Sequence, residues 1–191
     1  MESMLLRVYQ GQVVYLCKAA LLALDDIQGH GAPESGRLWY GVQNFIIAAG
    51  NLSKLFFAAG REPGRTQRYE ARQPLRESLG VTDESPLRQV HIRNDFEHLD
   101  ERLEEWWDES PNRNFIDANV GPEGMIVAGE GALGEKDTLR WLNPETGKVI
   151  FWGNELHIPS VAEEVRRLHP LAERLSMTPP EWDSLSAGGG P

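Results

Sequence analysis

The residues best suited to chemistry in this chain are an arginine, an asparagine and a histidine within one highly charged segment: Arg93, Asn94 and His98. An imidazole takes up or releases a proton near neutral pH, and a guanidinium keeps its charge and binds phosphate through several donors. Asn94 precedes His98 by about one helical turn, so it could orient the imidazole or bind a phosphate. The alternative is a purely structural role, in which His98 and Arg93 form an interhelical hydrogen bond and a surface ion pair.

A second group of candidates is a row of arginines at intervals of three and four residues. It comprises Arg61, Arg65, Arg68, Arg72 and Arg76. This spacing aligns guanidinium groups along one face of a helix, and Tyr69 lies beside them. The row could follow an RNA backbone, or it could be a solvated face paired with the acidic residues of 95–109.

Other kinds of site have weaker support. The i, i+4, i+7 spacing of His91, Asp95 and His98 would allow a metal site only with ligands from other helices, so we predict neither metal nor cofactor. Cys17 lies in an apolar stretch and is expected to be an inert buried thiol. The sequence has no Gly-rich phosphate loop between a strand and a helix, and no serine nucleophile elbow.

Helical spacing of apolar residues, together with breakers, predicts the elements that position these side chains. The expected helices are 5–27, 35–59, 65–79, 85–107 and 159–175. Pro74 should kink or split the third, a surface helix that Gly80 ends, and Ser85-Pro86 should begin the fourth. Short β-prone runs lie at 115–116, 125–127, 138–142 and 148–152, with 143–147 as a hairpin loop.

The predicted helix over 85–107 has two faces. One carries a core stripe made of Ile92, Phe96, Leu99, Leu103 and Trp106. Asn94 and His98 share the other, partly apolar face, which suggests that they lie at an interface with another helix or another chain.

Composition limits the class of protein. The chain has 191 residues, of which 40% are hydrophobic, and a formal net charge of −10. One soluble, ordered domain with a small appendage is expected, and any nucleic-acid contact must come from a local basic patch. A single cysteine, no evident signal peptide and no apolar run long enough to span a membrane favour a cytoplasmic protein.

The Arg93, Asn94 and His98 pattern resembles the Arg-x4-His motif on a late helix of the HEPN superfamily. The longer string over 92–102, with 48–54 on the second helix, looks like the abortive-infection branch of that superfamily. The resemblance covers about residues 5–110. It implies a mainly α fold, a four-to-five-helix up-and-down bundle over 1–110. The resemblance does not extend to 111–191, where the sequence itself predicts an appended small β-hairpin and helix over 111–185 and a disordered tail over 186–191.

The resemblance further implies a metal-independent endoribonuclease, a toxin or phage-defence effector with a possible cognate antitoxin. Its site would be composed from two copies of the motif across a homodimer. His98 would serve attack by the RNA 2′-hydroxyl or departure of the 5′-oxygen, and Arg93 would stabilise the phosphate. The alternative is a catalytically inactive HEPN-like module that dimerises or binds RNA or a protein.

Three further residues are expected to support this site. Glu97 and Glu101 could pair with Arg93 or His98, but they could equally be solvated charges, and carboxylates there repel RNA. Asn51, on the second helix, is expected to support the fourth helix or simply to satisfy its own polar groups against a neighbour.

Overall fold

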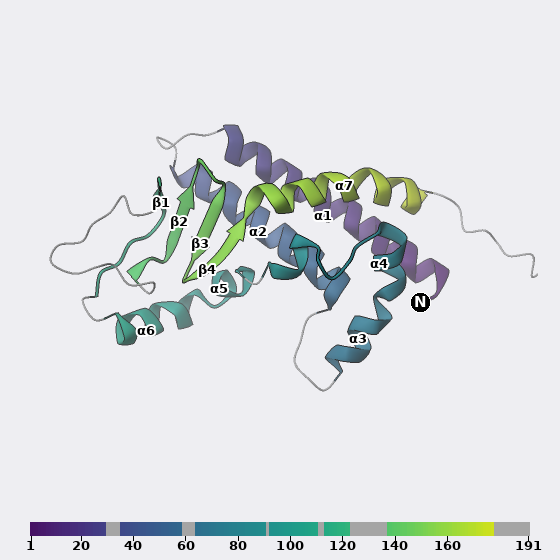
Figure 1. Cartoon of the computed structure of the whole chain (residues 1–191), viewed down its shortest axis with the longest axis horizontal. Helices are drawn as coiled ribbons and strands as arrows, with labels where there is room; N and C mark the ends of the chain where they lie inside the picture. Colours follow the sequence, from purple (N-terminus) through teal and green to yellow (C-terminus); the bar gives the residue numbers. More distant parts are fainter. Residues whose placement is uncertain (30–34, 59–63, 91, 111–112, 123–136, 178–191) are drawn as a thin grey trace, which may run out of the picture.

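The chain is mainly helical and carries one small four-stranded sheet, as its computed structural model shows (Figure 1). The structure describes residues 1–29, 35–58, 64–90, 92–110, 113–122 and 137–177. The predicted mainly α class is confirmed. The tail at 186–191 and the β-prone run at 125–127 lie outside the described residues.

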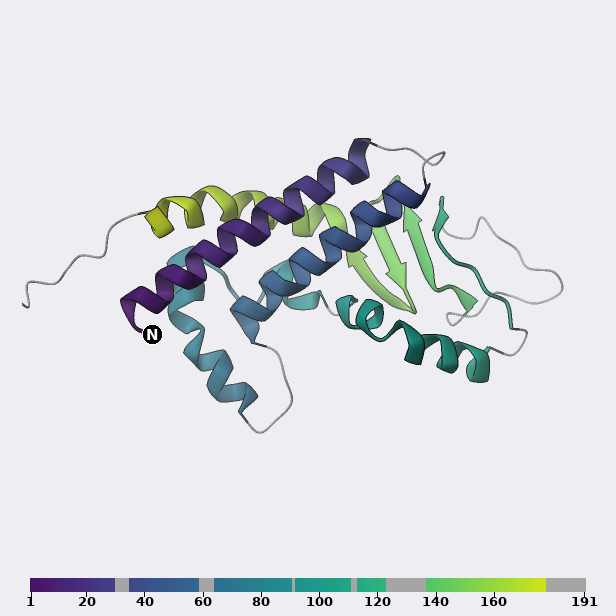
Figure 2. The same ribbon diagram turned by 180° about the vertical axis from the view of Figure 1, so that it is seen from behind.

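Three long helices form the body of the molecule: α1 (Ser3–Gly29), α2 (Ser35–Phe57) and α7 (Ile158–Met177). α1 and α2 run antiparallel, and α7 packs along α1 (Figures 1 and 2). Each buries an apolar face in a common core, which includes Phe45, Phe56 and Leu168. The sequence predictions for these three helices are confirmed within about two residues at each end.

The arginine-rich segment forms two short helices, α3 (Arg65–Ala71) and α4 (Gln73–Leu79). Pro74 lies in the first turn of α4, where its missing N–H breaks no helical hydrogen bond. Gly80 ends α4 with φ at 60°, a left-handed conformation that glycine adopts without strain. The predicted split and end are confirmed. The surface position holds for α3, whereas α4 buries Leu75 and Leu79.

The prediction of one continuous helix over 85–107 is wrong. Instead the chain forms a 3-10 helix, η2 (Pro86–Gln89), followed by α5 (Arg93–Glu97) and α6 (Leu99–Glu109). Ser85 does cap the first piece, since its Oγ accepts a hydrogen bond from the Leu87 amide. The helical path is lost at Val90, with ψ at 63°, and at His98, with ψ at 39°. Beside His98, Asp95 is bound by Asn154, 59 residues away, a long-range contact that can override helix propensity.

The predicted core stripe on this segment is correct only in part. Ile92 is buried and Phe96 and Trp106 are half-buried, whereas Leu99 and Leu103 are 39% and 38% exposed. The break at His98 turns α6 relative to α5, so apolar residues on either side of it no longer form one buried face.

The sheet contains β1 (Asn119–Val120), β2 (Arg140–Asn143), β3 (Lys148–Phe151) and β4 (Asn154–His157), in that order. β1 pairs with β2 in parallel, and the other neighbours are antiparallel. The predicted hairpin loop is confirmed: the Asn143 Oδ1 atom accepts from the amides of Glu145 and Thr146, 3.0 and 3.3 Å away. The strands β1 and β4, which the sequence pattern did not predict, extend this hairpin into a sheet.

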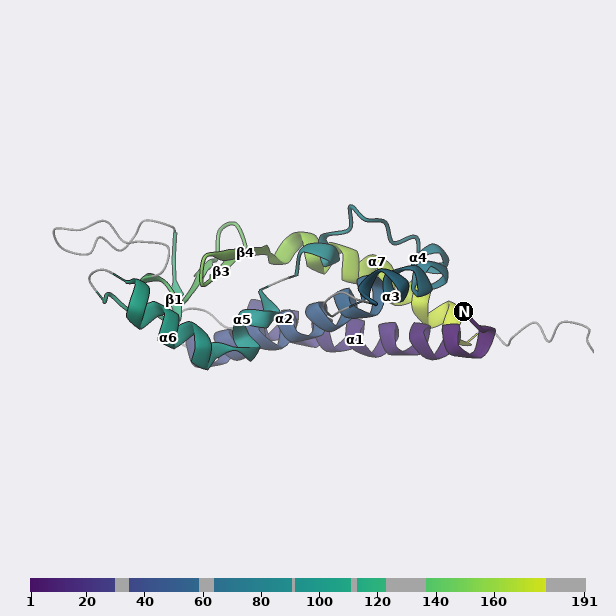
Figure 3. The same ribbon diagram turned by 90° about the horizontal axis from the view of Figure 1, so that it is seen from below.

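Seen from below, α1, α2 and α6 lie toward one side of the molecule, and α7 and the sheet toward the other (Figure 3). One apolar core includes residues of both predicted parts, 1–110 and 111–185, so the appendage shares the packing of the helices. The division at residue 110 stays a prediction. Among the described helices, none is long and apolar enough to cross a membrane.

Candidate functional site

The candidate residues lie where the short helix α5 packs against both α2 and the sheet. Arg93 begins α5, and His98 is the non-helical residue between α5 and α6. On the sheet side, the ring of Phe96 lies 4.0 Å from that of Phe151 on β3, centroid to centroid. The sequence-predicted pair thus lies at the two ends of one helical turn, held between an α-helix and a strand.

Arg93 is packed directly on a glycine of α2. A Cβ atom added to Gly50 would lie only 2.3 Å from the Cδ atom of Arg93 and 2.9 Å from its Cβ atom. Real Cβ atoms do not approach other atoms so closely, so the absence of a side chain at residue 50 permits this contact. The stretch over 48–54, noted in the sequence, therefore includes the surface on which Arg93 rests.

The guanidinium of Arg93 is incompletely hydrogen-bonded. Its side chain is only 12% exposed, and its Nη2 atom donates to Glu97 at 2.5 Å. Its Nε and Nη1 atoms are buried and have no hydrogen-bond partner in the part of the chain that the structure describes. Unsatisfied donors on a charged group are costly in a folded protein, so they mark Arg93 as a candidate functional group.

Two further charges adjoin Arg93. Lys54, one turn after Gly50 on α2, lies 3.7 Å from the other carboxylate oxygen of Glu97. Glu97 thus bridges two cations, and about half of its side chain is exposed. Of the alternatives that the sequence left open, the structure shows Glu97 paired with Arg93 and Glu101 with His98. Asn51, between Gly50 and Lys54 in the chain, is half-buried, and its supporting role stays a prediction.

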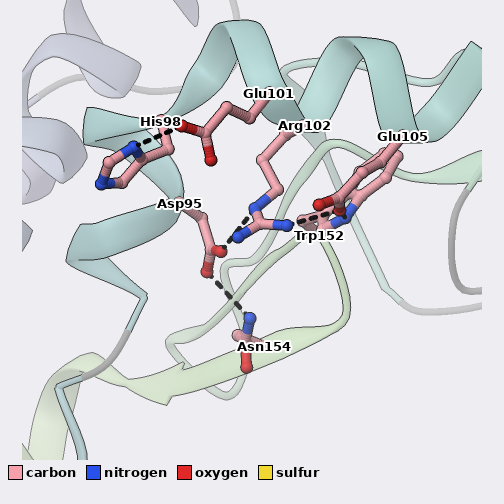
Figure 4. A network of polar contacts seen from close by, with 7 residues as sticks. All are labelled: Asp95, His98, Glu101, Arg102, Glu105, Trp152 and Asn154. Atoms are coloured by element: carbon pink, nitrogen blue, oxygen red, sulfur yellow. Dashed lines mark hydrogen bonds and ion pairs between the residues drawn. The ribbon is translucent and has the colours of Figure 1, made fainter.

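His98 is open to solvent, with 53% of its side chain exposed. Its Nδ1 atom lies 3.2 Å from a carboxylate oxygen of Glu101, and the ring extends away from the other labelled side chains (Figure 4). The backbone amide of His98 donates to the carbonyl of Asn94, whose side chain is exposed. A carboxylate on one imidazole nitrogen fixes the ring orientation and leaves the other nitrogen for a ligand.

A buried carboxylate braces the chain around His98. Asp95 is 5% exposed and accepts hydrogen bonds from Arg102 Nε at 3.1 Å and from Asn154 Nδ2 at 2.8 Å (Figure 4). Arg102 also binds Glu105, which accepts a hydrogen bond from the Trp152 indole at 3.2 Å. The network therefore joins α5, α6 and the β3–β4 turn across the break at His98.

Burial raises the pKa of Asp95 above its ordinary range, although the hydrogen bond from Asn154 and the charge of Arg102 oppose this shift. From the sequence, Asp95 was only a possible metal ligand or a partner of the arginine row, and Arg102, Trp152 and Asn154 were not candidates. No local signal identifies this network, because Asn154 is 59 residues from Asp95.

The arginine row does not form one continuous basic face. Arg65 and Arg68 on α3 are exposed. Arg72 instead stacks 4.3 Å over the ring of Tyr9. Arg76 is buried, donates to the carbonyls of Phe56 and Tyr69, and lies over the Tyr69 ring. Two of the five predicted members, Arg72 and Arg76, thus contact other parts of the chain instead, and Arg61 lies outside the described residues.

Within the described residues, no cluster of three or more histidine, cysteine, aspartate or glutamate side chains is arranged to hold a metal. His91, a member of the metal set considered from the sequence, lies outside those residues. Cys17 is buried, and burial together with the charge of Glu164 raises the pKa of its thiol to about 12. A thiol with that pKa is a poor nucleophile at neutral pH.

Comparison of the chain with protein-family models, curated proteins and solved structures gave no match. The resemblance to the HEPN superfamily consequently depends on the motif residues themselves.

The contact between Gly50 and Arg93 predicts the effect of one methyl group. Gly50→Ala should destabilise the protein by roughly 1–3 kcal/mol, since the new Cβ atom overlaps Arg93. The matched control is Gly11→Ala in α1, where a Cβ atom would meet nothing within 4 Å and should stabilise the helix by up to ~1 kcal/mol. Denaturant unfolding measures both. Arg93→Ala should restore part of the stability lost in Gly50→Ala, and full additivity of the two changes would contradict this contact.

The raised pKa of Asp95 predicts a pH dependence of stability. Because folded Asp95 keeps its proton to higher pH than unfolded Asp95, its contribution to the free energy of unfolding falls as pH rises from 3.8 through the raised folded-state pKa. The stability of wild type relative to Asp95→Asn should therefore fall over this interval and level off above it. Asp83→Asn is a control of opposite sign, since a hydrogen bond from Tyr69 lowers the pKa of Asp83. Unfolding curves across the acid range test this, and a relative stability of wild type that rises with pH in the Asp95 pair would contradict it.

Proposed function

We propose that this chain is a metal-independent endoribonuclease of the HEPN type, acting as a toxin or phage-defence effector. In this proposal, the helices within residues 1–110 correspond to the HEPN bundle, and α7 belongs to the appended part. The observation that carries the proposal is the placement of Arg93 at the start of α5 and of His98 at its end. The buried guanidinium has two donors without an acceptor among the described residues, and the imidazole is open to solvent.

The chemistry proposed for these groups needs no water or metal. His98 removes the proton from an RNA 2′-hydroxyl, and the oxygen attacks the adjacent phosphorus. The bond from phosphorus to the 5′-oxygen breaks, and that oxygen takes a proton from the imidazolium of a second His98. The products are a 2′,3′-cyclic phosphate and a 5′-hydroxyl. Arg93 would bind the phosphate and balance its developing negative charge.

Glu97 and Lys54 suit a site that exchanges one anion for another. Glu97 is half-exposed and forms ion pairs with both Arg93 and Lys54. A phosphate arriving at Arg93 could take the place of this carboxylate and gain a second cation at Lys54. Asn94, exposed on the same turn, would then contact the phosphate or the imidazole.

The second His98 would come from a homodimer partner. Apolar side chains follow the outer face of α1 at steps of three, seven and seven residues, which fit a 3.5-residue repeat. They are Leu5, Val8, Tyr15 and Leu22, which are 46%, 50%, 68% and 68% exposed. Such a stripe is typical of helices that pair with another helix, and an isologous contact between two copies would cover it. The exposed pair Arg65 and Arg68 is the proposed outer contact to the RNA backbone.

A second candidate function is a catalytically inactive HEPN-like module that binds RNA or a protein such as an antitoxin. It is favoured by the carboxylates of Glu97 and Glu101, which already pair with Arg93 and His98. The same carboxylates repel RNA, and they make the surface near His98 acidic.

Cleavage of RNA in the presence of a chelator separates the two functions. We expect His98→Ala to lower the cleavage rate by about 10²–10⁴-fold, because the proton acceptor and donor are lost. Arg93→Ala should also lower it strongly. His157→Ala is the matched control, since this exposed histidine lies on β4 outside the site and should retain wild-type activity. Equal cleavage by all four proteins, or none by any, would contradict the enzymatic function, and binding without cleavage would favour the inactive module.

A further inference from the structure

A hollow of about 370 Å³ lies beside the N-terminal half of α2. It is formed by Gly36, Trp39, Tyr40 and Gln43 of α2, by Ala118 and by Arg140 of β2. None of these residues belongs to the site proposed above. The hollow brings an exposed aromatic ring, a side-chain amide and a guanidinium together on one surface.

Two of the lining residues are polar groups with unusual surroundings. Trp39 is only 5% exposed, and its indole Nε1 is buried with no acceptor among the residues that the structure describes. Arg140 is held by both carboxylate oxygens of Asp117, at 2.6 and 2.5 Å, and lies 5.7 Å from the Trp39 ring. Tyr40, in contrast, is 64% exposed and presents its ring to solvent.

This combination suits a flat polar ligand better than a free phosphate. Because Asp117 neutralises Arg140, the hollow has no uncompensated positive charge among its described lining residues. Tyr40 offers a face for stacking, and Gln43 can both donate and accept hydrogen bonds at the edge of a planar ring. These are the interactions by which proteins bind unpaired nucleobases.

The hollow and the residue on which Arg93 packs lie along the same helix, α2. Gln43 and Gly50 are seven residues apart on α2, so they lie on nearly the same face and about 10.5 Å apart along the helix. Gly50 is the residue against which Arg93 packs. This distance along α2 equals the length of about three stacked nucleotides, at ~3.4 Å each. An RNA strand with its phosphate at Arg93 can thus place a base near Tyr40.

We propose that this hollow is a base-binding subsite, in which a nucleobase of single-stranded RNA stacks on Tyr40 and is read at its edge by Gln43. This inference rests on the proposed function, since it names the part of the substrate that binds beside the cleavage site. The subsite selects the base at a fixed distance from the reacting phosphate.

The test measures binding separately from cleavage. The probes are four 2′-O-methyl homo-oligonucleotides, of A, C, G and U, which cannot be cleaved because the attacking hydroxyl is blocked. Their affinities are measured for the full chain carrying His98→Ala, alone and combined with Tyr40→Ala or Gln43→Ala. The matched control adds Trp107→Ala, which removes a 52% exposed aromatic side chain of α6 outside the hollow.

We expect Tyr40→Ala to weaken binding of the preferred oligonucleotide by about 5- to 150-fold, the range for loss of one stacked base. Gln43→Ala should reduce the differences in affinity among the four probes, and Trp107→Ala should leave the affinities unchanged. Absence of binding to every probe, or equal losses in Tyr40→Ala and Trp107→Ala, would overturn the subsite.

The two proposals fail in different ways. If wild type does not cleave RNA but Tyr40→Ala still weakens binding, the base-binding subsite stands and the nuclease does not. If wild type cleaves RNA and Tyr40→Ala leaves binding unchanged, the nuclease stands and the subsite is wrong.

Discussion

The geometry of the candidate site depends on one buried carboxylate, that of Asp95. Hydrogen bonds and opposite charge offset the cost of burying an ionised group, and here Arg102 and Asn154 do so in part from the two sides, since burial still raises the pKa of Asp95. Since Asp95 lies before the break and Arg102 after it, their contact fixes the angle at which the chain turns at His98. Asn154 ties the same point to the sheet. The strands that follow residue 137 are thus part of the support for His98.

A close approach of α5 to α2 is the second constraint. Gly50 lets Arg93 rest on α2, where the guanidinium is nearly buried and only partly hydrogen-bonded. The protein therefore keeps a costly cation in place, with the half-exposed Glu97 as its partner. This arrangement gives the proposed phosphate contact a physical basis, because an incoming anion could take the place of Glu97 at the Arg93 Nη2 atom. It also explains how an acidic protein could bind RNA through local groups despite its net charge.

Features encoded by nearby residues were predictable from the sequence. Apolar spacing predicted α1, α2 and α7, Pro74 and Gly80 predicted the split and the end of the arginine-rich segment, and Asn143 and Gly147 belong to a correctly predicted turn. The motif singled out Arg93 and His98, and the structure places both at α5. What could not be predicted depends on long-range contacts. The break at His98 needs Asn154, the packing of Arg93 needs Gly50, and Arg76 turns inward to bind the carbonyl of Phe56.

The most direct test of the central claim is the chemical nature of the RNA ends made by the purified protein in excess chelator. Attack by the 2′-hydroxyl, assisted by His98, predicts fragments that end in a 2′,3′-cyclic phosphate and begin with a 5′-hydroxyl, and these fragments should be absent with His98→Ala. Fragments with 3′-hydroxyl and 5′-phosphate ends, or cyclic-phosphate ends that persist in His98→Ala, would contradict the account.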